Sequence, residues 1–319
     1  MSRAKRPLII DCDPGIDDFV AILLAHSSQQ FDIRAITTLG GNVRPEYTAV
    51  NARDTAALIG LDCAVGAGAQ TPLMGDLITA EYVHGPTGLG GVQLPRARRE
   101  LDRRPAWDIL YDEACRCRGK LEIAALGPLT NVAIMLRKHP EAAFMIDKLH
   151  IMGGSTTAGN HSAYGEFNIW EDPLAADIVF TSGIDLRMVG LNCTAQGICA
   201  ADVWQSGIHR PGTVLSKLRQ MMDYSAEQTR SWRPDTDILH YVPELPDAVA
   251  VAGMIDDTLL RCRRYPVLIE VSGTPSVGRT LVDWDGVSGR PRNCEVALQV
   301  DAARITELYR QMFAFYEER

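Results

Sequence analysis

The stretch IIDCDPGIDDFVAILLA, residues 9–25, carries four aspartates within eight positions. A short apolar run precedes them and a longer one follows, which predicts a strand that turns into a helix. Helix capping and the helix dipole account for one or two carboxylates at such a turn, for example Asp17 or Asp18. Four carboxylates repel one another unless a cation or protons neutralise them. Because the ligands are all oxygens, this turn predicts a site for calcium or magnesium.

Short apolar runs alternate with helical patterns along the 319 residues. The expected strands are 8–10, 33–39, 121–126, 149–152 and 186–191, and the expected helices are 17–26, 45–59, 106–115, 129–138 and 173–181. This alternation predicts an α/β fold with a Rossmann-like, mostly parallel sheet flanked by helices. After about residue 210 the pattern loosens, and we interpret the remainder as an appendage on the same core. The chain is therefore expected to form one domain, 1–319.

Composition narrows the range of partners. The net charge of −8 argues against binding to a nucleic acid. No apolar run approaches the roughly 20 residues that span a membrane. The eight cysteines show no paired CxxC spacing, so free thiols in a reducing, cytoplasmic compartment are expected. Neither a nucleic acid nor a membrane is therefore an expected partner.

Two further segments offer oxygen ligands for the expected metal. ELPDAVAVAG, residues 244–253, places Asp247 at the start of an apolar helix. ALGPLTNVAIML, residues 125–136, is a second strand–turn–helix, and its turn around Thr130 could contribute a backbone carbonyl. Taken alone, each of these turns is also compatible with an ordinary helix start.

The polar loop GNHSAYGEFNIWEDP, residues 159–173, follows an apolar run. Asn160, Glu166 and Asn168 supply amide and carboxylate groups, which suit the hydroxyls of a sugar. A solvated loop without a ligand is the alternative interpretation of this stretch.

Together these segments resemble the inosine–uridine-preferring nucleoside hydrolase family. The matching motifs are DCDPGIDD (11–18), TTLGGN ending at Asn42, VHGPTGLGG (83–91), ALGPLTN (125–131) and GEFN (165–168). They keep the order and spacing of the family from about residue 8 to the helix after Asp247. The resemblance implies the nucleoside hydrolase fold and calcium-dependent hydrolysis of ribonucleosides to ribose and free base. It also implies a homodimer or homotetramer and a role in purine salvage.

The resemblance also implies residue roles. Asp13, Asp18 and Asp247, with the Thr130 carbonyl, would hold Ca²⁺, and Asp13 would be the general base that activates the attacking water. Asp11 would support these residues from behind. The residues expected around the nucleoside are Asp17, Asn42, His84, Met152, Asn160, Glu166, Phe167 and Asn168. Of these, His84 is assigned to the pocket wall or the base, Phe167 to the substrate in general, and the others to the ribose.

The sequence departs from the family at Pro246. Many members have a histidine there, proposed to protonate the leaving base, and proline has no side-chain donor. Uracil leaves poorly without a nearby acid, so purine nucleosides are the favoured substrates. Tyr224, Trp232 and His240 precede Asp247 and could supply stacking or a proton, although ordinary packing is the alternative role for each.

Two other functions remain compatible with the sequence. A phosphatase of the haloacid-dehalogenase type also has an Asp-x-Asp pair after its first strand, here Asp11 and Asp13, but Gly15 stands where such enzymes have Thr or Val. A nucleoside-binding protein with weak turnover is the other alternative, and Pro246 is its only support.

Overall fold

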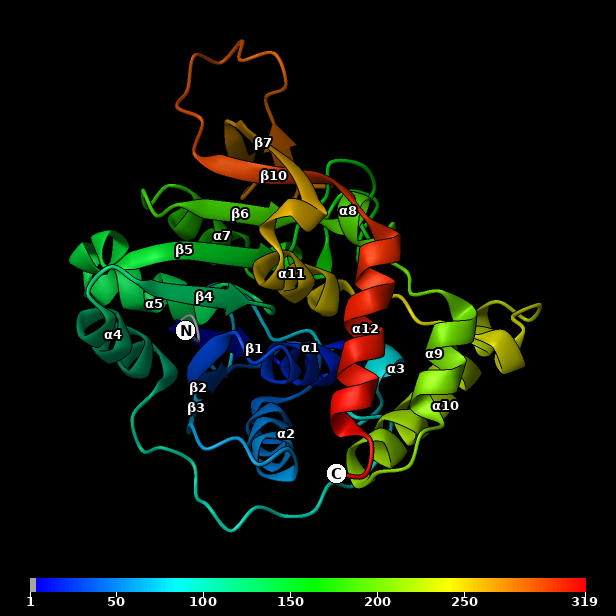
Figure 1. Ribbon diagram of the computed structural model, residues 1–319. Coiled ribbons are helices and arrows are strands. Elements are labelled where there is room, and N and C mark those ends of the chain that lie inside the picture. The colour runs from blue at the N-terminus through cyan, green and yellow to red at the C-terminus, as the bar shows by residue number, and fades with distance from the viewer. Residues whose placement is uncertain (1–3) are drawn as a thin grey trace.

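An eight-stranded sheet forms the centre of the computed structural model, which describes residues 4–319. In spatial order the strands are β3 (Ala64–Ala67), β2 (Phe31–Thr38), β1 (Arg6–Cys12), β4 (Leu121–Ala125), β5 (Ile146–Met152), β6 (Leu186–Val189), β10 (Cys294–Val300) and β7 (Leu260–Tyr265). All neighbours pair in parallel except β10 and β7, which are antiparallel (Figure 1). The predicted mostly parallel α/β sheet is confirmed.

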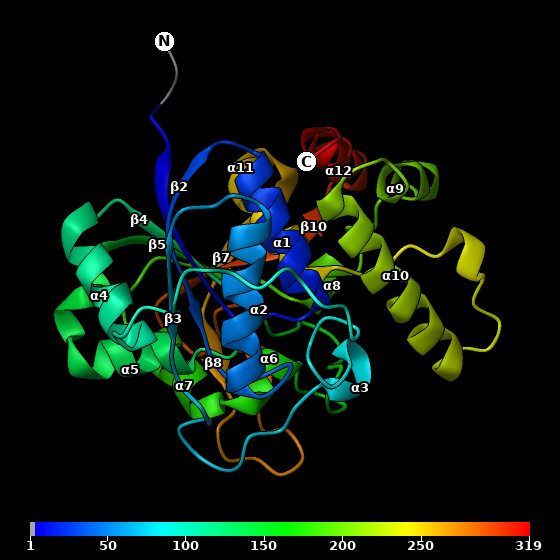
Figure 2. The same ribbon diagram turned by 90° about the horizontal axis from the view of Figure 1, so that it is seen from below.

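Helices cover both faces of the sheet, and each face has its own apolar core (Figure 2). One face carries α1 (Ile16–Ser27), α2 (Pro45–Leu58), α11 (Pro246–Ile255) and α12 (Ala302–Tyr316), with α9 (Ala201–Ile208) and α10 (Thr213–Trp232) outside them. The other carries α4 (Ala106–Cys117), α5 (Thr130–Lys138) and α7 (Pro173–Phe180). None of the helices described in residues 4–319 is long and apolar enough to cross a membrane.

The remaining elements are short and connect these layers. They are α3 (Glu81–His84), α6 (Phe167–Glu171), α8 (Leu191–Thr194), η1 (Pro140–Phe144), η2 (Ile238–His240), η3 (Asp257–Leu259), and the separate two-stranded sheet of β8 (Val267–Ile269) and β9 (Thr280–Val282).

The strand order reverses at β1. From β1 the chain continues to β2 and β3 on one side of the sheet, and then to β4, β5 and β6 on the other. The loops that follow β1 and β4 therefore diverge, although Asp11 of β1 is aligned with Ala125 of β4. In open α/β sheets ligands bind in the crevice that such a reversal creates beyond the carboxyl ends of the strands. The aspartate-rich turn 11–18 lies at this point.

The segment after residue 210 belongs to the central sheet and is not an appendage. Strand β10 pairs in parallel with β6, and β7 pairs with β10. Helix α11 packs against α1, and α12 contacts both. The C-terminal third therefore closes one face of the sheet and brings Asp247 toward the first strand.

Candidate active site

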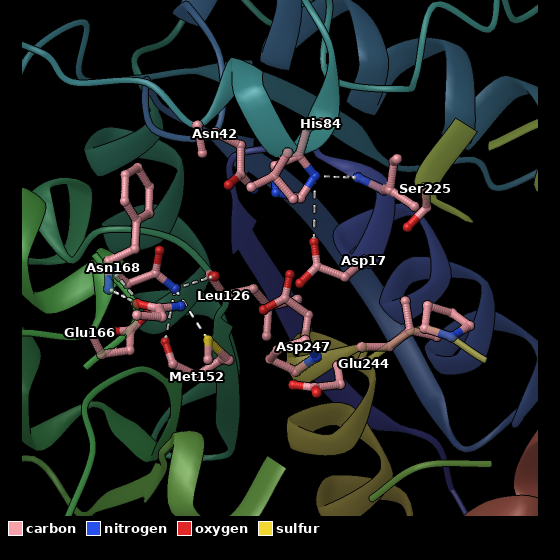
Figure 3. Close-up of a pocket in the computed structure, with 18 of the residues that line it drawn as sticks. Asp17, Asn42, His84, Leu126, Met152, Glu166, Asn168, Ser225, Glu244 and Asp247 are labelled. Carbon is pink, nitrogen blue, oxygen red and sulfur yellow. Dashed lines mark hydrogen bonds and ion pairs between the residues drawn. The ribbon is translucent and has the colours of Figure 1, made fainter. Parts of the chain in front are cut away.

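A cavity of about 210 Å³ opens at the reversal point of the sheet (Figure 3). The residues that line it are Ile16, Asp17, Asn42, Ala80, Tyr82, Val83, His84, Leu126, Met152, Asn160, Glu166, Phe167, Asn168, Ser225, Pro243, Glu244, Leu245, Pro246 and Asp247. They come from the ends of β4 and β5, from α1, α3, α6, α10 and α11, and from the loops between. The cavity is thus lined by segments more than 200 residues apart in the sequence, such as those that contain Asp17 and Asp247.

Four aspartates cluster at the floor of this cavity: Asp17 and Asp247 line it, and Asp13 and Asp18 lie next to them without lining it. Asp13, Asp18 and Asp247 are buried, and one carboxylate oxygen from each of Asp17, Asp18 and Asp247 lies within 4.8 Å of the others. Burial, followed by the charge of Asp18, raises the pKa of Asp13 well above its usual range. Burial and the charge of Asp17 do the same to the pKa of Asp247, and they raise the pKa of Asp18 to about 7. Carboxylates this close and this buried would repel one another strongly unless a cation or protons neutralised them.

The donor atoms of this group fit a hard cation. Buried oxygens of Asp13, Asp17 and Asp247 (Oδ1 in each) have no hydrogen-bond partner. No lysine or arginine is among the described residues that line the cavity. Unpaired buried carboxylate oxygens without a counter-charge are the ligands that Ca²⁺ or Mg²⁺ prefers.

The group differs in part from the ligand set expected from the sequence. Asp18 and Asp247 are included as expected, and Asp17, assigned to the ribose, is close enough to share the same cation. Asp13 lies beside them, since its backbone N–H donates to Asp18 Oδ1 at 3.3 Å. The Thr130 hydroxyl donates to Asp172 (2.7 Å), and the role of its carbonyl stays a prediction.

Asp13 is held in a slot that two glycines leave open. A Cβ atom at Gly127 would lie 2.5 Å from Asp13 Oδ1, and one at Gly41 would collide with Oδ2. The Asn42 backbone N–H donates to Oδ2 at 2.7 Å, so this oxygen is fixed and Oδ1 is left unpaired. These contacts explain why the motifs around 41 and 127 contain glycine. They also leave one carboxylate oxygen free to take a proton.

His84 holds the start of helix α1. Its Nδ1 accepts a hydrogen bond from the Ile16 backbone N–H at 3.1 Å and lies 4.0 Å from Asp17 Oδ1. A ring nitrogen that accepts carries no proton, so the proton of the neutral imidazole is on Nε2. Burial lowers the pKa of His84, and the nearby charge of Asp17 opposes this shift. A Cβ at Gly15 would lie 2.6 Å from Nδ1, so glycine is needed there for close approach. His84 is in the cavity wall, as expected.

Asp11 lies behind the cavity floor and does not line the cavity. Its Oδ1 accepts hydrogen bonds from the Thr37 hydroxyl (2.6 Å) and from Asn131 Nδ2 (2.8 Å). Burial raises the pKa of Asp11 to about 6, although both hydrogen bonds oppose the shift. Asn131 also donates to the Thr38 carbonyl at 3.1 Å and thereby ties β1, β2 and α5 together under the site.

Three of the residues expected to contact the ribose, Met152, Glu166 and Asn168, lie together at one end of the cavity (Figure 3). Asn168 Nδ2 donates to the carbonyls of Leu126 (2.8 Å) and Met152 (3.1 Å), which leaves its Oδ1 to face a ligand. Glu166 accepts three backbone N–H groups, from Asn168 (3.0 Å), Gly154 (2.8 Å) and Ile169 (3.2 Å), and so caps α6. Acceptors held in this way suit hydroxyl donors of a sugar.

The exposed loop before α6 completes this end. Asn160 Oδ1 accepts the Phe167 backbone N–H at 2.9 Å, and both residues line the cavity. The side chain of Phe167 is buried, whereas Asn160 is exposed at the rim. All eight residues predicted around the nucleoside thus line one cavity.

The three side chains considered for the base end occupy different positions. Trp232 is half exposed, and its ring centroid lies 6.1 Å from that of Tyr82, which lines the cavity mouth. Tyr224 packs against the turn at Gly85 and Gly90 and is not among the described lining residues. His240 is exposed and bonds Asp237 at 2.7 Å, outside the cavity. For Tyr224 and His240 the structure favours packing and surface roles.

Comparison with known proteins agrees with this geometry. A family model described as inosine-uridine preferring nucleoside hydrolase matches residues 8–307. The chain belongs to the inosine-uridine preferring nucleoside hydrolase family. The resemblance identified from the sequence motifs is therefore confirmed, and with it the expectation that the chain is an enzyme of this family.

Named members of this nucleoside hydrolase family span the chain. The pyrimidine-specific ribonucleoside hydrolase RihA of Photobacterium profundum is 36% identical over 98% of this chain and 100% of its own length. The non-specific ribonucleoside hydrolase RihC of Salmonella paratyphi B is 34% identical over 98% of this chain and 99% of its own. The structure of the purine-preferring ribonucleoside hydrolase from Gardnerella vaginalis superposes with a TM-score of 0.90 at 30% identity, covering 98% of this chain and 99% of that one.

Three polar side chains in this nucleoside hydrolase site were not expected from the sequence. Tyr82, Ser225 and Glu244 line the cavity, and none carries a motif that points to a site. Ser225 belongs to the long amphipathic helix α10, where a serine is typical of a polar face. Tyr82 stands next to the VHGPTGLGG motif, and this position was the only available signal.

Proposed function

We propose that this nucleoside hydrolase is calcium-dependent and cleaves the N-glycosidic bond of ribonucleosides to ribose and free base, with purine nucleosides favoured. The observation that carries the proposal is the group of buried, unpartnered carboxylate oxygens at the floor of a cavity lined by sugar-binding groups. Asp17, Asp18 and Asp247, with Asp13 beside them, would hold the ion.

The chain's own groups account for the chemistry. Breaking an N-glycosidic bond builds positive charge on the ribose, which the carboxylates of Asp17 and Asp247 favour. Asp13 Oδ1, left free because Asn42 holds Oδ2, would take the proton of the attacking water. Asn168 and Glu166 would orient the hydroxyls of the ribose. Calcium would supply positive charge that offsets the carboxylates and polarises that water.

The purine preference is supported by the base end of the cavity. Pro246 lines it where many family members have histidine, so it offers no acid for a poor leaving group such as uracil. The rings of Tyr82 and Trp232, tilted by 56° to each other, offer apolar area to a two-ring base. The relatives named above include a pyrimidine-specific, a non-specific and a purine-preferring enzyme. Membership of the family therefore does not determine which base is preferred, and the proposed preference rests on this chain's own residues.

Ribose release tests the proposed function. Inosine, uridine and p-nitrophenyl riboside are incubated with the protein, with chelator and then with calcium restored. We expect release from inosine to exceed release from uridine, to stop with chelator and to return with calcium. Nucleoside binding without ribose release would favour the binding-protein alternative. Inorganic phosphate released from phosphate esters would favour the phosphatase alternative.

Removal of either aromatic ring at the mouth is expected to weaken purine binding. Base stacking on one aromatic side chain contributes about 1–3 kcal/mol, so Tyr82→Ala or Trp232→Ala should raise KM for inosine about tenfold. KM for p-nitrophenyl riboside should change less, because its single ring offers less area. Trp284→Ala, which removes a half-exposed ring that packs on Tyr265, is the matched control. An unchanged KM for inosine in both variants would contradict a role in stacking.

A further inference from the structure

The leaving base must face the end of the cavity opposite the ribose-binding groups. Figure 3 shows Asn168, Glu166 and Met152 at one end, Ser225 at the other, and Asp17 and Asp247 between them. A ribose held at the first end with its reacting carbon over the aspartates directs its base toward Ser225. This placement rests on the proposed function.

The hydroxyl of Ser225 is oriented by a hydrogen bond with the hydroxyl of Tyr241. Its Oγ lies 2.9 Å from the hydroxyl oxygen of Tyr241, and that oxygen lies 3.1 Å from Thr229 Oγ1. Gln205 Nε2 donates to the Tyr241 carbonyl at 2.7 Å and fixes the loop against α9. Three hydroxyls thus form a chain that runs from Ser225 on α10 to Tyr241 in the loop before α11 and back to Thr229 on α10.

The other donors in this wall are less suited to give a proton. His84 Nδ1 accepts from the Ile16 N–H, so the ring is held as a neutral imidazole, which is a weak acid. Tyr82 is half exposed, and none of the described residues bonds its hydroxyl. Pro246 has no donor. Of the described lining residues, Ser225 is the only one at the base end whose hydroxyl is hydrogen-bonded to a phenol, that of Tyr241. A phenol is far more acidic than an aliphatic alcohol, so Tyr241 can supply a proton through Ser225.

We propose that Ser225 protonates the departing purine and that Tyr241 resupplies the proton. As the N-glycosidic bond breaks, its electron pair goes to the base. The Ser225 Oγ–H proton passes to a ring nitrogen of that base, and the Tyr241 proton passes to Ser225 Oγ. Tyr241 is left as a phenolate that accepts a hydrogen bond from the Thr229 hydroxyl, and it regains a proton from water. Ser225 is then a catalytic residue, and Tyr241 acts through it.

Substrates that differ in their need for an acid test this proton path. A nitrophenolate leaves without protonation, whereas a purine does not. Ser225→Ala should lower kcat for inosine about 100-fold and Tyr241→Phe about tenfold, since a positioned acid contributes at least this much. In both variants kcat for p-nitrophenyl riboside should change little. Ser225→Thr keeps the hydroxyl and should retain most of the inosine activity.

The controls separate this proposal from the proposed function and from misfolding. Ser231→Ala removes an exposed hydroxyl on the same helix, bonded to the Gln228 carbonyl, and should leave both rates unchanged. The wild-type rate on inosine tests the proposed function by itself. Equal losses on both substrates in Ser225→Ala with an unchanged melting temperature, or no loss on inosine, would overturn the proton path.

Discussion

Asp13→Asn is expected to lower kcat for every ribonucleoside by about 10⁴-fold, at the upper end of what a general base contributes. Asparagine has the same shape and can still accept the Asn42 N–H if its amide oxygen takes the place of Oδ2, but the amide nitrogen then at the free position cannot take a proton. The same change removes one of four crowded carboxylates, so the melting temperature of the metal-free protein should rise. Steady-state kinetics and thermal unfolding in chelator measure the two effects.

In Asp13→Asn, kcat is expected to fall while the melting temperature rises, and a general loss of folding would lower both. Asp147→Asn is the control, because Asp147 is exposed near the start of β5, at the end of that strand away from the cavity. A melting temperature that falls together with kcat would mean that Asp13 serves mainly to build the fold. A kcat within a few-fold of wild type would rule out its role as the base.

Glu166→Gln is expected to change the pH dependence of stability by about 3 kcal/mol. Burial raises the pKa of Glu166 from 4.5 to about 7 in the folded chain. Between these values the folded state holds a proton that the unfolded state has released, so stability falls as pH rises through this window. Glutamine resembles the protonated form and does not titrate. The variant should therefore gain free energy of unfolding relative to wild type between pH 5 and pH 8.

Urea unfolding of the metal-free protein at the two pH values measures this difference. Glu227→Gln, on the exposed side of α10, is the matched control and should show the same difference from wild type at both. If Glu166→Gln behaved in the same way as this control, Glu166 would titrate normally, and its burial among backbone N–H groups would have no energetic consequence.

Local patterns were sufficient for most of the fold. The helix expected at 45–59 is α2 (Pro45–Leu58), because proline at its start and the alternation of apolar residues are local signals. Strand β3 was missed, since AVGA is short, contains small residues and becomes a strand only through its pairing with β2. The placement of β10 beside β6 depends on contacts across more than 100 residues, which no local window contains.

The site could be predicted where a motif carried it. The turn 11–18 predicted a cluster of carboxylates, and the loop 159–173 supplied three predicted residues that line the cavity, Asn160, Glu166 and Asn168. The tight approach of Gly127 to Asp13 could not be inferred, because it depends on how β1 and β4 lie side by side. Ser225 was missed for a similar reason: only the fold turns its face of α10 toward the cavity.

The order of strands in the sheet also constrains how the chain can assemble during synthesis. Strand β7 leaves the ribosome before β10, yet in the finished sheet it pairs only with β10. Until β10 has been made and has docked on β6, β7 is a strand without a partner, and the far edge of β6 is open. Unpaired edges of this kind invite pairing with other chains. Three residues of β7 are exposed arginines: Arg261, Arg263 and Arg264. Their positive charges would oppose pairing with another chain until β10 is in place.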